Sequence, residues 1–174
     1  MQIHNVKNTL LLGLMAVVLS SLQIALYAGE EQIDVKDLPP AVLAAFQKTY
    51  PKAEIKGVSK EDEDGRIAYE IESVEGKVVR DVLYSEEGQV LEVEEEMAFK
   101  ALPAGVQKTI TDNYPDAEVE KAEKITKNGS INYEVVVETD DEILEIMLDA
   151  QGKIIKTESS KENEEEEAEE EAEE

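Results

Sequence analysis

Carboxylates are the side chains of this sequence that offer the most chemistry. Asp and Glu together number 42 among 174 residues, Lys and Arg number 17, and the formal net charge is −25. There is no cysteine, and the single histidine is His4. Thiolate nucleophiles, disulfides and cysteine-ligated zinc sites are therefore excluded, and a chain processed after residue 28 would also lack any His-dependent triad. Glycoside hydrolysis and Mg²⁺ or Ca²⁺ binding remain open on composition.

An acidic segment, Asp62-Glu-Asp-Gly65, has the residue types of a calcium-binding loop. In the EF-hand frame, however, Lys60 would be the first ligand and Ile71 the twelfth, and neither side chain can ligate calcium. We interpret the segment as an acidic hairpin turn. The sequence therefore predicts no metal site here, and we identify no catalytic residue and no cofactor site.

The sequence repeats itself at an offset of 64 residues. Residues 35–94 align without gaps with residues 99–158, and 15 of the 60 pairs are identical. Similarity at a fixed period indicates a duplicated structural unit. We predict a first unit over residues 29–96 and a second over residues 97–159.

Each copy is predicted to open with a helix. Three apolar residues recur at i, i+4 and i+8, which places them on one helical stripe, and the proline that follows ends the helix. These residues are Val42, Phe46, Tyr50 and Pro51 in the first copy and Val106, Ile110, Tyr114 and Pro115 in the second.

Four strands are predicted to follow each helix, because apolar residues alternate between turn-forming glycines. The segments are 54–62, 67–71, 78–84 and 90–93, and then 118–126, 131–135, 143–148 and 154–157. The first segment of each copy breaks strict alternation. The predicted fold class is α+β, with two tandem units that each pack one N-terminal helix on a four-stranded antiparallel sheet.

The strand face that points away from the helix is predicted to be acidic. If Glu75-Gly76 forms a two-residue turn, Glu70 lies opposite Asp81, and the same register in the second copy places Glu134 opposite Glu145. Like charges opposed across strands cost stability. Either the face is simply solvated, or it is a recognition surface with acidic rims and apolar centres. The apolar neighbours on this face are Val79, Leu83, Ile143 and Met147.

The amino-terminal segment, residues 1–28, is typical of a secretory signal peptide. It has no Asp or Glu, one lysine, an apolar run from Leu10 to Leu19, then Ser20-Ser21, and then Leu22 to Ala28. Cleavage after Ala28 would leave no membrane span, whereas an uncleaved segment could act as an anchor because it approaches the length of a span. We expect a periplasmic or secreted protein.

The carboxyl-terminal segment is a low-complexity sequence rich in glutamate. Residues 158–174 hold eleven glutamates and one lysine, and such a composition cannot bury a core. We predict a disordered acidic tail over residues 160–174. The strong negative charge argues against nucleic acid and favours a protein or peptide with a basic surface, and weak Ca²⁺ binding is open.

The repeated unit resembles the PepSY-like family, including its branch that is similar to the β-lactamase inhibitor fold. The resemblance rests on a Leu-Pro-x-x-Val helix start, a Tyr-Pro-x-Ala helix exit, a Tyr-Glu strand and the turn glycines Gly88 and Gly152. It implies an envelope or secreted protein whose sheet is a binding face, since some relatives are protease-associated or inhibit enzymes. Tandem β-lactamase inhibitors of this architecture carry disulfides, which this chain lacks.

Three functions follow as hypotheses. The first is an exported, non-enzymatic binding protein that inhibits or regulates an envelope or secreted hydrolase through its sheet face. The second is an acidic envelope protein that binds divalent cations. The third, a carboxylate enzyme, is the least favoured, because a small repeat without histidine has little room to build a cleft.

Overall fold

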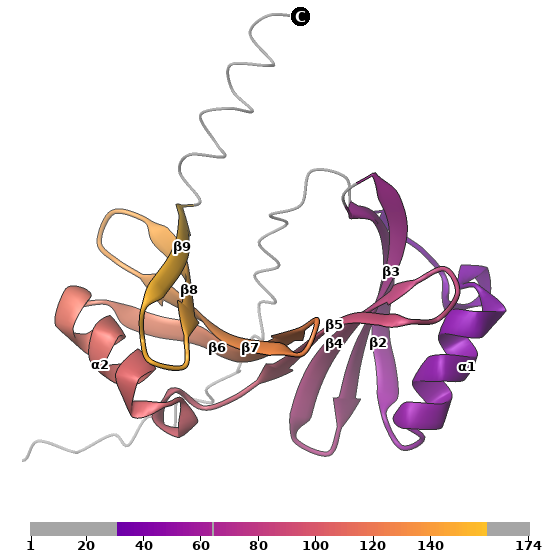
Figure 1. The fold of residues 1–174 in the computed structure, drawn as a ribbon, viewed down its shortest axis with the longest axis horizontal. Coiled ribbons are helices and arrows are strands. Elements are labelled where there is room, and N and C mark those ends of the chain that lie inside the picture. Colours follow the sequence, from indigo (N-terminus) through magenta and orange to yellow (C-terminus); the bar gives the residue numbers. More distant parts are fainter. Residues whose placement is uncertain (1–30, 64, 160–174) are drawn as a thin grey trace, which may run out of the picture.

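The computed structural model describes residues 31–63 and 65–159 (Figure 1). The predicted signal peptide over residues 1–28 and the predicted acidic tail over residues 160–174 lie outside the described residues. Within the described part, none of the helices has the length and apolar character needed to cross a membrane.

Within residues 31–63 and 65–159, nine strands form one antiparallel sheet in which each strand pairs with its neighbours in the sequence. The strands are β1 (Glu31–Gln32), β2 (Glu54–Glu63), β3 (Arg66–Glu75), β4 (Val78–Ser85), β5 (Val90–Glu96), β6 (Glu118–Lys127), β7 (Ser130–Glu138), β8 (Ile143–Asp149) and β9 (Ile154–Ser159). The helices are α1 (Pro40–Thr49) and α2 (Ala104–Asn113), each preceded by a short 3₁₀ turn, Val35–Asp37 or Phe99–Ala101. The predicted α+β class with antiparallel strands is confirmed.

The junction between the two sequence copies is a strand pair. The last strand of the first copy, β5, pairs with the first strand of the second copy, β6, and Glu94 lies opposite Ile125 there. The sheet is therefore continuous, and the division into two four-stranded units stays a prediction. The continuity matters for function because side chains from both copies share one surface.

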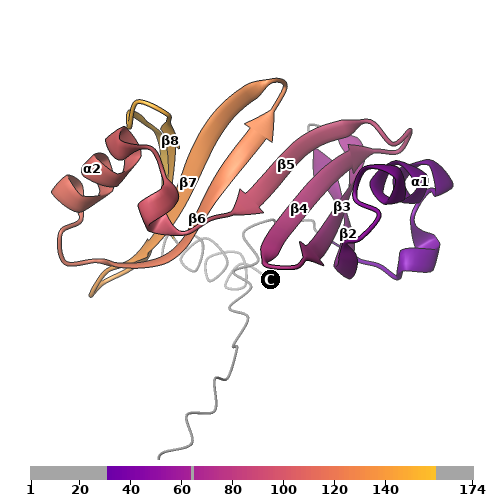
Figure 2. The ribbon, with the colours of Figure 1, turned by 90° about the horizontal axis from the view of Figure 1, so that it is seen from below.

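Both helices cover the same face of this sheet, at its two ends (Figures 1 and 2). Helix α1 buries Val42 and Phe46 in a first hydrophobic core with residues of β3 and β4, and α2 buries Val106 and Ile110 in a second core with residues of β7 and β8. The predicted helical stripes therefore form two hydrophobic cores.

Strand register explains why the two cores lie on one side of the sheet. Val93 of β5 packs on the first core and pairs directly with Thr126 of β6. Thr126 lies on the same face of β6 as Ala122, which belongs to the second core, because side chains four residues apart on a regular strand point the same way. The opposite side of the sheet is left without a helix in the described part of the chain.

A β-bulge at the same place in each copy explains the broken alternation of the first predicted strand. The register shifts between Ile55 and Gly57 on β2 and between Val119 and Lys121 on β6. A bulge inserts one residue, so the alternation of side chains between the two faces shifts by one position there. Val119 therefore packs on the second core, while Lys121 points to the other face beside Glu123.

The predicted register of β3 and β4 is wrong by two residues. Glu75 pairs with Val78, so the turn is Gly76-Lys77 and not Glu75-Gly76. Gly76 has φ 69°, a left-handed value that glycine adopts without steric cost at the first central position of a hairpin turn. The faces of the strands are unchanged by this correction, because a shift of two residues preserves alternation.

The opposed pairs change with the register. Glu70 lies opposite Leu83 and not Asp81, and Asp81 lies opposite Glu72. In the second copy Glu134 lies opposite Met147, and Glu145 lies opposite Val136. Acidic residues do oppose one another across this sheet, but in pairs other than those predicted.

Candidate functional site

The face of the sheet that points away from both helices, which we call the open face, is concave. Figure 1 shows the two ends of the sheet rising on the side opposite the helices. Ser59, Leu83, Ile125 and Val136 lie on this face and are buried, although no helix of the described chain covers them. The bend explains this burial, because neighbouring side chains converge on the inner side of a curved sheet.

Acidic side chains cross the middle of the open face from strand to strand. Cross-strand partners are Glu72 and Asp81, Asp81 and Glu94, Glu96 and Glu123, and Glu123 and Glu134. We call this set the acidic row; its members are Glu72, Asp81, Glu94, Glu96, Glu123 and Glu134. It spans β3 to β7, so both sequence copies contribute to it.

Three carboxylates of the acidic row meet at the junction of the copies. One oxygen each from Asp81, Glu94 and Glu123 lies within 4.8 Å of the other two. Glu123 is 1% exposed, which makes it the most buried of the three. We call Asp81, Glu94 and Glu123 the central cluster. Three like charges so close together are stable only if protons or cations offset them.

Lys121 supplies one positive charge to the central cluster. Its Nζ lies 2.9 Å from Oε2 of Glu123, and its side chain is 41% exposed. Burial alone would lower the pKa of Lys121, but the charges of Glu123, Asp81 and Glu94 outweigh burial and raise it. The ammonium is therefore held in its charged form at the edge of the cluster.

The carboxyl groups around Lys121 bind protons more tightly than ordinary acids do. Burial raises the pKa of Asp81 to about 7 and that of Glu94 to about 8, and the charge of Glu123 adds to both shifts. Burial likewise raises the pKa of Glu134 to about 7, with a further contribution from Glu145. Burial also raises the pKa of Glu123, against the opposing charge of Lys121. The single positive charge of Lys121 does not offset the negative charge that these buried carboxyl groups carry when ionised.

The residues predicted from the sequence to form a binding face lie on the open face, but only some reach its centre. Asp81 belongs to the central cluster and Glu134 to the acidic row. Glu70 accepts a hydrogen bond from Ser59 Oγ at 3.4 Å, and Glu145 lies opposite Glu158 toward the sheet edge. The apolar neighbours on β4 and β8 occupy the same face; they are Val79, Leu83, Ile143 and Met147.

Sequence reasoning missed Glu94, Glu123 and Lys121. Their signal was present, because Glu94 follows the alternation of β5 and points away from Val93 in the core. Recognising the central cluster requires knowing that β5 pairs with β6, and two copies with separate sheets would never bring these residues together.

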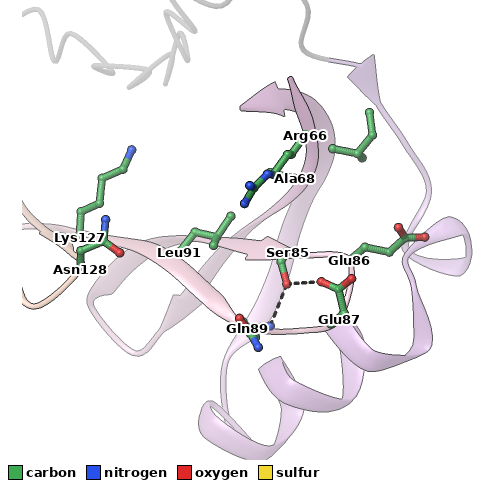
Figure 3. Close-up of a pocket in the computed structure, with 10 residues that line it drawn as sticks. Arg66, Ala68, Ser85, Glu86, Glu87, Gln89, Leu91, Lys127 and Asn128 are labelled. Carbon is green, nitrogen blue, oxygen red and sulfur yellow. Dashed lines mark hydrogen bonds between the residues drawn. The ribbon is translucent and has the colours of Figure 1, made fainter. Parts of the chain in front are cut away.

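A hollow of about 860 Å³ lies where β4 and β6 end, beside the β4–β5 and β6–β7 turns (Figure 3). Its polar groups hold the β4–β5 turn together: Ser85 Oγ donates to Glu87 Oε2 at 2.9 Å, and Gln89 N donates to Ser85 Oγ at 3.4 Å. These contacts explain the arrangement as turn structure, so the central cluster is the stronger candidate site.

The sequence matches one protein-family model over residues 27–92 and again over residues 68–156. The family is described as "Putative beta-lactamase-inhibitor-like, PepSY-like". The chain belongs to the PepSY-like family. The resemblance inferred from the repeated motifs is thereby confirmed, and two overlapping matches are consistent with two copies. A comparison with curated proteins found no match.

Solved structures of similar fold come from Bacteroides species. A DUF2874 family protein from Bacteroides ovatus is 20% identical, with a TM-score of 0.57 over 70% of this chain and 86% of that chain. A protein from Bacteroides eggerthii, described among "putative periplasmic proteins", is 15% identical, with a TM-score of 0.61 over 70% and 88%. A BLIP-like protein from Bacteroides fragilis is 19% identical, with a TM-score of 0.55 over 68% and 84%. At these identities the likeness of the PepSY-like chain to them is one of fold.

Proposed function

We propose that this PepSY-like protein is an exported, non-enzymatic binding protein that holds a partner with a basic surface on its open face. The observation that carries the proposal is the acidic row, which gathers desolvated carboxyl groups from both copies on one continuous sheet. Complementary charge steers such encounters and selects partners. We propose further that the partner is an envelope or secreted hydrolase, which the protein inhibits or regulates.

Electrostatics favours a cationic partner. Asp81, Glu94 and Glu134 are partly desolvated and carry raised pKa values, so their charged forms lack sufficient compensation in the free protein. Lysine or arginine side chains of a partner would supply that compensation, and the apolar residues beside the row would add buried area. A partner bound this way should dissociate faster as salt rises, because exposed charge pairs are screened.

The same geometry argues against catalysis. The oxygens of the central cluster lie within 4.8 Å of one another, on strands of one sheet. Glycosidase carboxylates instead flank the bond they cleave, whereas these three project from one side of the sheet. The family description and the BLIP-like neighbour support a role in inhibition, and the neighbour described as periplasmic supports action in the periplasm.

Affinity capture with the mature protein tests the proposal. The bait would be compared with a double variant, Glu94→Lys and Glu134→Lys, and with a matched control, Glu54→Lys and Glu118→Lys, that makes the same charge change at exposed positions. We expect an envelope hydrolase to be captured by the wild type and the control and lost with the double variant. Its activity should fall when the wild-type protein is added.

Three results would contradict the proposal. If every captured protein bound the double variant and the control equally, the open face would not be the binding surface. If the captured partner had an acidic surface, or its binding were insensitive to salt, charge complementarity would not be the basis of recognition. If a hydrolase were captured but its activity did not change, the protein would bind it without inhibiting or regulating it.

A further inference from the structure

The outer edge of β9 is an open edge of the sheet. Among the strands in residues 31–63 and 65–159, β9 pairs with β8 alone and therefore ends the sheet (Figure 1). A strand at a sheet edge offers a row of backbone N–H and C=O groups to a further strand. We propose that β9 pairs antiparallel with β9 of a second molecule of this protein, which joins two sheets into one. The pairing is independent of the proposed function, because it needs no other partner.

The first sequence copy shows the corresponding edge in use. At the offset of 64 residues, β9 corresponds to β5, and β6 covers the outer edge of β5 through five residue pairs. Both strands follow a turn with a left-handed glycine, Gly88 or Gly152, and both show a register shift at the same place against the preceding strand. The repeated unit therefore accepts a further strand at this edge, and in the second copy no described strand takes that place.

The other edge of the sheet is less suited to pairing. Within the described residues its outermost strand, β1, has two residues, which pair with Lys60 and Ser59 of β2. Such a short edge strand offers little backbone to a further strand. In contrast, β9 has six residues, and its Ile154 and Ile155 side chains are 36% and 51% exposed. A second strand at this edge would cover part of that apolar surface.

The charges of β9 select one register for a pair of identical strands. A two-fold axis perpendicular to the sheet at Thr157 places Lys156 opposite Glu158 of the second molecule, and Glu158 opposite its Lys156. Thr157 then lies opposite Thr157 of the second molecule. Opposite charges and paired threonines stabilise antiparallel strands, whereas an axis at Lys156 or at Glu158 would oppose two like charges. The sequence of β9 is therefore complementary to itself in this register.

The side chains of Lys156 and Glu158 are accessible for this contact. They are 58% and 51% exposed, and Nζ of Lys156 lies 2.6 Å from Oε1 of Glu158. Glu158 also lies opposite Glu145 of β8, so a second ammonium beside Glu158 would offset a like-charge pair. The negative charge of the whole chain opposes association at long range, but about 0.15 M salt screens charges that are more than about 8 Å apart.

Sedimentation equilibrium of the mature protein in about 0.15 M salt tests the pairing. We expect a monomer–dimer equilibrium. Lys156→Glu and Glu158→Lys should each raise the dissociation constant at least about tenfold, because each turns two opposite-charge pairs into like-charge pairs. An equimolar mixture of the two variants should dimerise again, because their charges are complementary. Glu118→Lys, at an exposed position of β6, is the control and should not weaken the dimer.

Two results of the sedimentation experiment would overturn the proposal. One is a protein that stays monomeric up to about millimolar concentration. The other is a dimer that neither charge variant weakens, which would place the contact elsewhere. If Glu158→Lys strengthened the dimer, general repulsion between the acidic chains would control association, and the proposed register would be wrong.

A cysteine at the proposed axis locates the contact, since the chain has no cysteine of its own. Thr157→Cys should form a disulfide-linked dimer under mild oxidation, because opposed residues of paired strands have Cα atoms within reach of a disulfide. Thr49→Cys, at an exposed position of α1, is the matched control and should crosslink far less. Equal crosslinking of the two variants would overturn the proposal. Crosslinking of Thr157→Cys to a different envelope protein, and not to itself, would assign the edge to that protein and overturn it too.

Discussion

The carboxyl group of Glu72 lies over Gly57, so closely that a Cβ on Gly57 would come within 2.8 Å of the carboxyl carbon. Gly57 occupies the position in the first copy that Lys121 occupies in the second, at the offset of 64 residues and at the matching bulge. In the first copy the Glu72 carboxyl therefore occupies the place beside the bulge at which the second copy has the lysine.

The correspondence between Gly57 and Lys121 predicts the effect of introducing a lysine at position 57. Gly57→Lys should place an ammonium beside Glu72 and Asp81 and raise stability at pH 8 by about 0.5–1 kcal/mol relative to Gly57→Met. Glu72 can turn aside for either side chain because its carboxyl is the free end of a flexible chain. Urea denaturation of the two variants measures the difference. Equal stabilities would show that the acids of the first copy are already compensated.

The acidic row predicts a stability that falls as pH rises. The folded pKa values are about 7 for Asp81, about 8 for Glu94 and about 7 for Glu134, whereas unfolded carboxyls have pKa values of about 4. The folded state therefore keeps protons that the unfolded state has lost. The stabilisation is fully present below about pH 4 and is lost as pH rises through about 7–8.

Melting temperatures measured across this pH range test the prediction. Between pH 5 and pH 8 the melting temperature should fall, and Glu94→Gln should make the fall shallower because a neutral amide does not titrate. Glu86→Gln, in an exposed turn, should leave the slope as it is. A wild-type melting temperature that rises over this range would contradict the assigned direction of the pKa shifts.

Much of the fold was accessible from the sequence because its signals are local. The helical stripe of Val42 and Phe46 and the proline stops act within a few residues, and they predicted the helices and their buried sides. The register of β3 and β4 was missed by two residues because the sequence does not say which position of the Gly76 turn takes the left-handed conformation. The central cluster depends on β5 pairing with β6, a contact between the two copies that no local pattern specifies.

Substitution of Gly152 by alanine should lower the free energy of unfolding strongly. Its φ is 86°, and a Cβ there would collide with the carbonyl of Gly105 on α2. Gly129 has a similar φ of 79°, but nothing lies within 4 Å of a Cβ built on it. Gly152→Ala should therefore cost about 2–3 kcal/mol, and Gly129→Ala about 1 kcal/mol from backbone strain alone. Equal losses in urea denaturation would mean that α2 moves aside without cost.

Substitution of Arg80 should destabilise the fold and leave the open face intact. It lies on the helix side and is 9% exposed; Nη2 donates to Glu95 Oε1 at 2.8 Å, and the guanidinium stacks 4.3 Å from the centre of the Tyr50 ring. Arg80→Met should cost about 1–3 kcal/mol, because it removes both contacts and leaves Glu95 with a weaker partner. Lys124→Met removes only the 3.5 Å contact to Glu95 and should cost about 0.5 kcal/mol or less.

The Arg80 variants also separate folding from binding. Because Arg80 and the acidic row occupy opposite faces of the same sheet, Arg80→Met should lower the urea midpoint while partner capture in the absence of urea stays near the wild-type level. The double variant Glu94→Lys and Glu134→Lys should instead lose the captured partner. If Arg80→Met instead lost the partner as the double variant does, the two faces would be coupled through β4, and the acidic row would depend on the helix-side packing.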